Sequence, residues 1–245
     1  MSRVIFELIN QYAILMRMKN VVSVVVPCYN EQRCLADCLQ SIARQSVKAL
    51  EVIVVDNNST DNSVEIAKKF GAIVVNEKKQ GIFYARNRGF NAAKGKIIAR
   101  IDADSVADVD WIKSITETMR DRNLVAIGGI SYTYELRWLL PLAIAVHAIF
   151  NRFHEKRLYG LTVLYGFNMA VRKNVWKNLE QQLDENCINE DIDFSMQVQK
   201  HGKVLRSSRM IVGNRLAGIM NPIKLIRYWK ADGESAKRIK KELGS

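Results

Sequence analysis

Ile97-Ile98-Ala99-Arg100-Ile101-Asp102-Ala103-Asp104-Ser105 is a mostly apolar, β-branched run that ends in two aspartates one residue apart. The apolar part is typical of a buried β-strand, and a helical pattern follows the loop at Trp111–Arg120. In an open α/β sheet, ligands bind beyond the carboxyl ends of the strands, which makes the acidic pair a candidate site. Alternation along an extended segment would point Asp102 and Asp104 the same way, close enough to share one divalent cation. An Asp-x-Asp pair by itself more often belongs to a solvated turn or a helix cap.

The composition of the chain is that of a globular protein. Its 245 residues are 48% hydrophobic, enough for one large domain or for one domain with a small appendage. The formal net charge of +12 and the isoelectric point near 9.6 favour an anionic partner: nucleotide phosphates, nucleic acid or an anionic membrane surface. The four cysteines form no CxxC pair and have no nearby histidine to complete a zinc site, so we expect a reduced, cytosolic compartment.

Neither a signal peptide nor a transmembrane helix is expected. Residues 1–20 form an N-terminal extension that mixes apolar and charged residues and lacks the apolar core and small-residue cleavage site of a signal peptide. The longest apolar run, Trp138–Phe150, has 13 residues. That is shorter than the roughly 18 to 20 residues that cross a bilayer.

Strands and helices alternate through the first hundred residues. We expect strands at Val21–Val26, Glu51–Val55, Ala72–Val75 and in the run that reaches Asp102, with helices at Gln32–Gln45, from the Thr60 region to about Phe70, and from Gly81 to about Gly95. This rhythm predicts a parallel, doubly wound sheet with right-handed crossovers. Asn30 is a candidate N-cap of the first helix, and Gly71 a candidate left-handed C-cap of the second.

Polar side chains follow three of the four predicted strands. They are Tyr29, Asn30 and Glu31 after the first, Asp56 after the second, and Asp102 and Asp104 after the fourth. A buried rim of carboxylates is costly unless it is neutralised, so a metal ion together with nearby arginines is the economical solution. The chain contains neither GxGxxG nor GxxxxGK[ST], which argues against a dinucleotide-binding Rossmann domain and against a P-loop NTPase.

Six ordered segments resemble the motifs of the family 2 nucleotide-sugar glycosyltransferases. They are Val24–Glu31 (VVVPCYNE), Val54–Asp61 (VVDNNSTD), Ala85–Gly89 (ARNRG), Asp102–Asp104 (DAD), Gly166–Arg172 (GFNMAVR) and Asn189–Asp193 (NEDID). The resemblance covers about residues 21–215. It implies an α/β protein of the GT-A fold, with a Rossmann-like, mainly parallel central sheet flanked by helices and a C-terminal acceptor-side portion. It divides the domain into a nucleotide-binding half, 21–110, and an acceptor-side half, 111–215.

The resemblance also implies which residues bind the donor. It places Pro27, Tyr29 and Glu31 along the nucleotide pocket, Asp56 at the nucleobase, Arg86 beside the donor, and Asp102 with Asp104 at the metal and ribose. A nucleoside diphosphate gathers negative charge as it leaves, and Mg²⁺ or Mn²⁺ held by Asp104 would offset that charge. Asp102 is then the better candidate for the ribose. The alternative for Arg86 is a solvated helix face, because Arg88 and Lys94 lie on the same predicted helix.

A second acidic segment, Asn189–Asp193, is the candidate for the catalytic base. An inverting transfer needs a group that takes the proton of the acceptor hydroxyl, and a carboxylate at a loop-to-helix junction suits this. Asp191 matches the second acid of the family's Glu-Asp pair, and we expect Glu190 and Asp193 to raise its pKa. The alternative is that these acids only cap the following helix.

The segment before this one is expected to shape the donor or acceptor pocket. Gly166-Phe167-Asn168 is typical of a turn that leads into a strand at Met169–Val171. A role for Gly166 and Asn168 in the pocket, beside Glu190, is implied by the resemblance, and the alternative is a tight turn that needs glycine.

Two departures from the family pattern affect what the resemblance implies. Many relatives carry a histidine after the base as a further metal ligand, but here only His201 follows Asp191, and the later segment is Gly213-Asn214-Arg215, where Arg215 is an alternative partner for the diphosphate. Processive synthases carry Gln-x-x-Arg-Trp, which Leu225–Trp229 does not match. We therefore predict transfer of a single sugar.

Two segments suggest contact with a membrane or a lipid-linked acceptor. Glu135–Tyr159 is a mainly apolar stretch with basic flanks, which is typical of a helix at a membrane interface. A helix buried in the core is the alternative. Residues 216–245 form a basic amphipathic tail, in which Pro222–Ser245 carries seven basic and three acidic residues. A solvated C-terminal helix is equally compatible with that tail.

The sequence thus predicts an inverting, metal-assisted glycosyltransferase that moves one sugar from a UDP- or GDP-type donor to a glycan or lipid-linked acceptor. It would work in the cytoplasm, at or near the inner face of the membrane, in cell-envelope polysaccharide synthesis, and no nucleic-acid partner is expected. A nucleotidyltransferase is disfavoured because no glycine-rich phosphate loop follows the first strand. A non-enzymatic basic module that binds membranes or nucleic acid is the remaining alternative.

Overall fold

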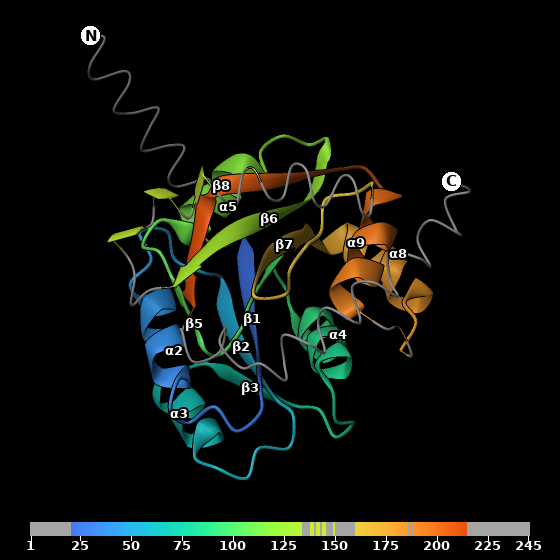
Figure 1. Ribbon diagram of the computed structural model, residues 1–245. Coiled ribbons are helices and arrows are strands. Elements are labelled where there is room, and N and C mark those ends of the chain that lie inside the picture. Colours follow the sequence, from blue (N-terminus) through green and yellow to red (C-terminus); the bar gives the residue numbers. More distant parts are fainter. Residues whose placement is uncertain are drawn as a thin grey trace, which may run out of the picture.

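The fold is described from a computed structural model of the chain, shown in Figure 1. It describes residues 21–133, 160–185, 187 and 189–214, with a few positions between 138 and 149. The expected N-terminal extension, Arg215 and the C-terminal tail lie outside the described residues. The helices and strands are β1 (Val22–Cys28), α2 (Leu35–Ala43), β2 (Glu51–Asp56), α3 (Ser63–Lys69), β3 (Ile73–Asn76), α4 (Ile82–Ala92), β4 (Ile97–Ile101), β5 (Ser105–Ala107), α5 (Trp111–Thr118), β6 (Leu124–Thr133), β7 (Asn168–Arg172), α8 (Lys173–Leu179), a 3₁₀ turn (Glu180–Gln182), α9 (Glu190–Gln199) and β8 (Lys203–Asn214).

One eight-stranded sheet runs through the described part of the chain in the order β3-β2-β1-β4-β7-β6-β8-β5. The strands β3, β2, β1 and β4 are parallel neighbours, as predicted for the first hundred residues. β7 then inserts antiparallel between β4 and β6, and β8 runs parallel to β6. The sheet is therefore mixed, and the later half of the chain brings β7 directly beside the strand that ends at Asp102.

Alternate side chains of the strands build two separate cores, one on each face of the sheet. Val24, Val26 and Ala99 pack with α2, α3 and α5, whereas Val25 and Ile98 pack with α4, α8 and α9. In Figure 1, α2 and α3 lie on one side of the strands, and α4, α8 and α9 lie on the other. Arg100 has the same parity as Ile98, so the pleat turns its side chain toward the α4–α9 layer.

The predicted elements of the first half are present, with differences at their ends. Gly71 follows α3 with φ 72°, which confirms the left-handed C-cap. The prediction that Asn30 caps the first helix is wrong, since α2 begins at Leu35. Asn30 is itself left-handed at φ 56°, and its side-chain oxygen accepts a hydrogen bond from the Thr60 backbone at 2.8 Å. It therefore ties together the loops that follow β1 and β2.

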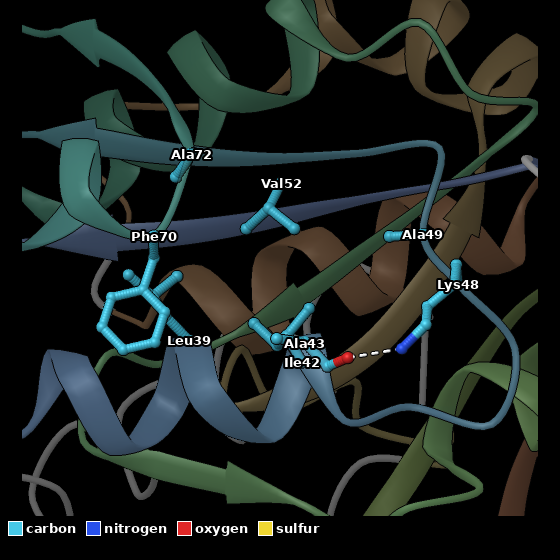
Figure 2. Close-up of a pocket in the computed structure, with 8 residues that line it drawn as sticks. All are labelled: Leu39, Ile42, Ala43, Lys48, Ala49, Val52, Phe70 and Ala72. Carbon is cyan, nitrogen blue, oxygen red and sulfur yellow. Dashed lines mark hydrogen bonds between the residues drawn. The ribbon is translucent and has the colours of Figure 1, made fainter.

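A small apolar pocket lies far from the acidic rim. Figure 2 shows it between α2 and the edge of the sheet, lined by Leu39, Ile42, Ala43, Lys48, Ala49, Val52, Phe70 and Ala72. Val52 lies near the amino end of β2, whereas Asp56 lies at the carboxyl end of the same strand. The pocket is thus at the wrong end of the sheet for the predicted chemistry.

No helix within the described ranges is long and apolar enough to cross a membrane.

Candidate functional site

The loops after β1 and β2 form one side of the rim. Cys28, the last residue of β1, pairs in register with Asp56, so Tyr29 and Glu31 follow directly beside it. Tyr29 is 51% exposed, while Glu31 is half-buried and its backbone N–H binds the Ser63 hydroxyl at 2.9 Å. The Asp56 carboxylate accepts a hydrogen bond from the Ser59 backbone at 3.0 Å. Pro27 is buried within β1.

The two rim aspartates lie in different surroundings. Asp102 Oδ1 is 3.4 Å from Arg100 Nη2, and its side chain is 38% exposed. Asp104 Oδ1 lies 3.5 Å from the Ser105 hydroxyl, which also donates to Asn214 at the end of β8 at 2.9 Å. Asp104 therefore has no strong internal partner among these contacts, whereas Asp102 faces a buried cation.

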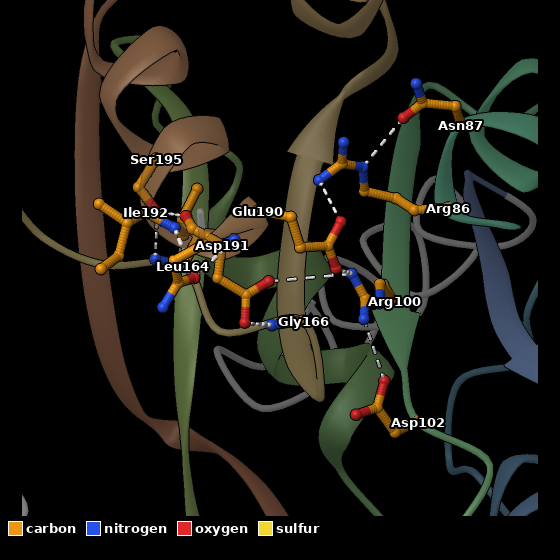
Figure 3. Close-up of polar contacts among 11 residues, drawn as sticks. Arg86, Asn87, Arg100, Asp102, Leu164, Gly166, Glu190, Asp191, Ile192 and Ser195 are labelled. Atoms are coloured by element: carbon orange, nitrogen blue, oxygen red, sulfur yellow. Dashed lines mark hydrogen bonds and ion pairs between the residues drawn. The ribbon is translucent and has the colours of Figure 1, made fainter. Parts of the chain in front are cut away.

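A buried ionic network joins this rim to the start of α9, as Figure 3 shows. Glu190 lies between two arginines, with Oε2 2.7 Å from Arg86 Nη1 and Oε1 2.8 Å from Arg100 Nη1. Arg100 Nη1 is also 3.9 Å from Asp191 Oδ1. Arg100 therefore reaches carboxylates of both the rim after β4 and the predicted base segment.

Arg86 is not on a solvated helix face. Its side chain is 1% exposed, and its guanidinium carbon lies 5.0 Å from the Phe83 ring centroid and 5.1 Å from that of Phe194. Nε donates to Asn87 at 3.0 Å. Burial excludes the solvated alternative for Arg86 and places it behind Glu190.

Asp191 is held at the first turn of α9 by two neighbours. Its Oδ2 accepts a hydrogen bond from the Gly166 backbone at 3.1 Å, while Oδ1 is buried and accepts none from the described residues. The helix itself is capped by Asn189, whose side chain accepts from the backbone N–H groups of Asp191 and Ile192. Because Asn189 supplies the cap, the acidic side chains are not needed for that purpose.

Glu190 and Asp191 have opposite pKa shifts although they are adjacent. Burial raises the pKa of Asp191 to about 7, and the charge of Glu190 adds to this, while Arg100 opposes it. Burial also disfavours ionised Glu190, but Arg86 and Arg100 outweigh it and hold the pKa of that carboxyl below its usual value. Of the two neighbours expected to raise the pKa of Asp191, Glu190 is the one that contributes strongly. Two adjacent carboxyls with separated pKa values are typical of acid–base sites.

Gly166 is required for space and not for a left-handed turn. Its φ is not positive, but a Cβ built on it would lie 2.3 Å from Arg100 Cζ and 2.4 Å from Nη2. Asn168 is 1% exposed, and its side chain bonds to Trp111 Nε1 and to the carbonyls of Ile130 and Met210 at 2.8 to 2.9 Å. These hydrogen bonds join β7 to β6, β8 and α5, so Asn168 would affect a pocket indirectly, by holding these elements together.

Arg100 is the residue of this site that the sequence did not bring forward. The signal was available, because a charge inside the apolar run Ile97–Ile101 must be buried, and a buried charge needs a partner. Its partners, Glu190 and Asp191, lie ninety positions along the chain, and the sequence gives no means of identifying them.

The rim suits a divalent cation that arrives with phosphates. No group of three or more His, Cys, Asp or Glu side chains in the described ranges could hold a metal alone. His201 is exposed in the turn after α9, one helix length from Asp191. Mg²⁺-type sites commonly use one or two carboxylates plus substrate phosphates. The charge of Asp104 helps to raise the pKa of Asp102, after burial and against Arg100, and a shared cation would relieve that repulsion.

Comparison with known proteins shows the family of the chain. The family model "Glycosyl transferase family 2" matches residues 23–179. Glycosyltransferase GlyG of Streptococcus pneumoniae is 32% identical over 124 residues, 48% of this chain and 41% of GlyG. An uncharacterized glycosyltransferase of Haemophilus influenzae is 28% identical over 91% of this chain and 72% of its own. The chain thus spans less than half of GlyG and most of the second relative.

Solved structures share the fold. The mannosyltransferase PcManGT of Pyrobaculum calidifontis, solved with GDP-Man and Mn²⁺, superposes with a TM-score of 0.65 over 90% of this chain and 68% of its own, at 18% identity. At that identity the likeness concerns the fold alone, and it confirms the predicted α/β architecture of GT-A type.

Proposed function

The chain belongs to glycosyltransferase family 2, and we propose that it moves a single sugar, with inversion, from a nucleoside diphosphate donor to an acceptor hydroxyl. We further propose that residues 21–110 bind the donor, that residues 111–215 form the acceptor side, and that the acceptor is a glycan or a lipid-linked molecule. PcManGT was solved with GDP-Man and Mn²⁺, which supports a donor of the nucleoside diphosphate-sugar class.

One observation carries this proposal: the base candidate and the donor-side aspartate belong to the same buried ionic network. Asp191 on α9 and Asp102 after β4 both face Arg100, at 3.9 Å and 3.4 Å. A solvated cap or turn has no need for a fully buried guanidinium between its acids. A transferase does need donor and acceptor groups at fixed spacing, because reacting atoms must be held a few ångströms apart.

Asp191 is the residue proposed to take the proton of the acceptor hydroxyl. Its Oδ2 is held by the Gly166 N–H, while its buried Oδ1 accepts no hydrogen bond from the described residues. The side chain as a whole keeps 24% of its surface in solvent, and there an acceptor hydroxyl would lose its proton to the carboxylate as its oxygen attacks the anomeric carbon and the nucleoside diphosphate leaves. A pKa of about 7 suits this role, because such a carboxyl group is about half ionised at neutral pH and exchanges a proton readily there.

The donor side is proposed to consist of the loops after β1, β2 and β4. Tyr29 and Glu31 would line the nucleotide and Asp56 its base, while Asp102 would face the ribose. Asp104 would hold Mn²⁺ or Mg²⁺ together with the diphosphate. When bound there, the cation offsets the negative charge that gathers on the leaving diphosphate. Arg86 is buried behind Glu190 and would act by holding that carboxylate, so it would touch the donor less directly than the resemblance implies.

Contact with the inner face of an anionic membrane is also proposed. Three large apolar side chains at helical spacing are exposed: Trp138 (76%), Leu142 (58%) and Ile149 (62%). Arg137 and Arg152 flank them in the sequence, and the whole chain carries +12. Exposed apolar residues with basic flanks suit the boundary of anionic lipids, where a lipid-linked acceptor would be found.

The proposal is tested by isothermal titration with UDP and GDP, each with and without MnCl₂. We expect binding of at least one nucleotide that is lost when EDTA is present, and a much weaker response for Asp104→Ala. If the wild-type protein binds neither nucleotide under any metal condition, the proposed function is wrong.

The role of Asp191 is tested separately from donor binding. Asp191→Asn should bind the metal–nucleotide complex as the wild type does and lose turnover by about a hundredfold or more. Turnover is followed as nucleoside diphosphate released from UDP-glucose, UDP-GlcNAc or GDP-mannose. Turnover at the wild-type level in Asp191→Asn would remove Asp191 as the base.

A further inference from the structure

Arg100 occupies a position where an apolar residue would be expected. Every residue of β4 is buried, and the Arg100 side chain is 3% exposed. Replacement of a buried ion pair by well-packed apolar residues is often neutral or stabilising. Stability of the sheet therefore does not explain a guanidinium here, and its contacts must be considered.

One guanidinium serves three carboxylates from two separate segments. Nη2 faces Asp102, while Nη1 faces both Glu190 and Asp191. Without the cation these three acids repel one another, since Asp102 and Glu190 each oppose ionisation of Asp191. A planar fork with several fixed donors can face acids in two directions at once, which the single ammonium of a lysine cannot do.

The chain also makes room for this side chain at a cost. A Cβ on Gly166 would lie within 2.5 Å of Cζ, Nη1 and Nη2 of Arg100. The same glycine donates its backbone N–H to Asp191 Oδ2 at 3.1 Å. Gly166 and Arg100 thus form one unit that fixes both oxygens of Asp191, one by a hydrogen bond and one by charge.

We propose that Arg100 is a positioning residue that fixes the donor-side Asp102 and the acceptor-side Asp191 relative to each other, with Gly166 as the space that admits it. Arg100 touches neither donor nor acceptor and acts through the two aspartates. The inference rests on the proposed function, because it takes Asp102 and Asp191 to serve the two substrates. The inference adds that one side chain of β4 sets the distance between the donor site and the acceptor site.

The test compares Arg100→Lys with Arg172→Lys in the full chain. Arg172, on the neighbouring strand β7, donates to the backbone carbonyls of Leu124, Met119 and Asp121, and none of these three hydrogen bonds involves a carboxylate. It therefore controls for the loss of a well-bonded arginine. Two quantities are measured: the Kd of the UDP or GDP complex with Mn²⁺, by titration, and kcat for nucleoside diphosphate release from the matching nucleotide sugar.

Positioning predicts that Arg100→Lys changes both quantities, since misplacement by about 1 Å costs on the order of a hundredfold in rate. We expect kcat to fall about 10- to 100-fold and Kd to rise at least about threefold, while Arg172→Lys stays within about twofold of wild type. In the Asp191→Asn background, Arg100→Lys should lower kcat no further, because Arg100 acts on turnover through Asp191.

Each other outcome overturns the proposal. If Arg100→Lys behaves like Arg172→Lys, Arg100 is only structural; if Kd alone changes, its link to Asp191 is wrong. Gly166→Ala keeps the arginine at position 100 but displaces its guanidinium, so it should also lower kcat and raise Kd. It provides the same test if Arg100→Lys fails to fold. A wild-type protein that binds no nucleotide would instead count against the proposed function.

Discussion

Replacement of Asp191 by asparagine should stabilise the protein above about pH 7 while it strongly lowers turnover. The pKa of Asp191 is raised by burial from 3.8 to about 7. The folded state therefore pays for ionising this group: the penalty is absent below about pH 4, grows as the pH rises toward 7 and is constant above it. An asparagine, which cannot ionise, removes that penalty.

The size of the effect follows from the two pKa values. A tenfold change in acidity corresponds to about 1.4 kcal/mol, so the full difference gives a ceiling of about 4 kcal/mol above pH 7. The Asp191 side chain keeps 24% of its surface in solvent. We therefore expect about 2 kcal/mol, which would raise the melting temperature by roughly 4 to 8 °C for a chain of this size.

The assay is urea denaturation of wild type and Asp191→Asn in steps between about pH 5 and pH 8, where the difference in the free energy of unfolding should grow with pH. Asp61→Asn is the control of opposite sign. Partial burial disfavours ionised Asp61, but hydrogen bonds from Ser63 and Gln32 outweigh it and lower its pKa, so that variant should lose stability at neutral pH. A difference for Asp191→Asn that stays flat, or that turns negative at pH 8, would refute the account of a buried, strained carboxylate.

Three further measurements probe the site and its surroundings. The rate of nucleoside diphosphate release should rise with pH and level off above about 7, as Asp191 ionises. Glu190→Gln should move that rise to lower pH, because the charge that helps to raise the pKa of Asp191 is gone. An unchanged pH profile would contradict an effect of Glu190 on the pKa of Asp191. Asn168→Ala should lower the free energy of unfolding by roughly 3 kcal/mol or more, since it leaves Trp111 Nε1 and the carbonyls of Ile130 and Met210 without their buried partner. An unchanged melting temperature would show that these hydrogen bonds do not stabilise the fold. The protein should float with anionic liposomes at low salt, and Trp138→Glu with Leu142→Glu should abolish flotation; a protein that stays in the soluble fraction would disprove the membrane contact.

The nucleotide half of the fold could be predicted because its signals are local. Each of its strands is an apolar run followed by polar loop residues, and each helix lies between two such runs, so order and direction follow from short-range patterns. The sheet beyond β4 has no such signals. Gly128-Gly129 in the middle of β6 indicates a break, yet a Cβ on Gly129 would lie 2.3 Å from the Met210 carbonyl, so the glycine is there to let β8 approach.

The direction of β7 was equally hidden. The sequence predicts a strand at Met169–Val171, and β7 is present there as Asn168–Arg172, but a local pattern does not state which neighbour a strand pairs with or in which direction. β7 pairs antiparallel with β4, Ile101 opposite Asn168, and this pairing brings Gly166 to the end of β4. The half proposed to bind the acceptor thereby reaches the proposed donor-side rim through a contact that only the assembled sheet defines.

The choice between Glu190 and Asp191 shows what the assembled site adds to the sequence. Both are acids at a helix start, and composition or capping rules cannot separate them; the resemblance alone favoured Asp191. In the fold, Glu190 meets two buried guanidinium groups within 2.8 Å and stays ionised, whereas Asp191 meets one at 3.9 Å and a single backbone N–H. Glu190 thus neutralises the arginines, and its charge, added to burial, keeps Asp191 able to exchange a proton near pH 7. An acid committed to neutralising cations makes a poor base, so the division of roles follows from which carboxylate lies closer to the arginines.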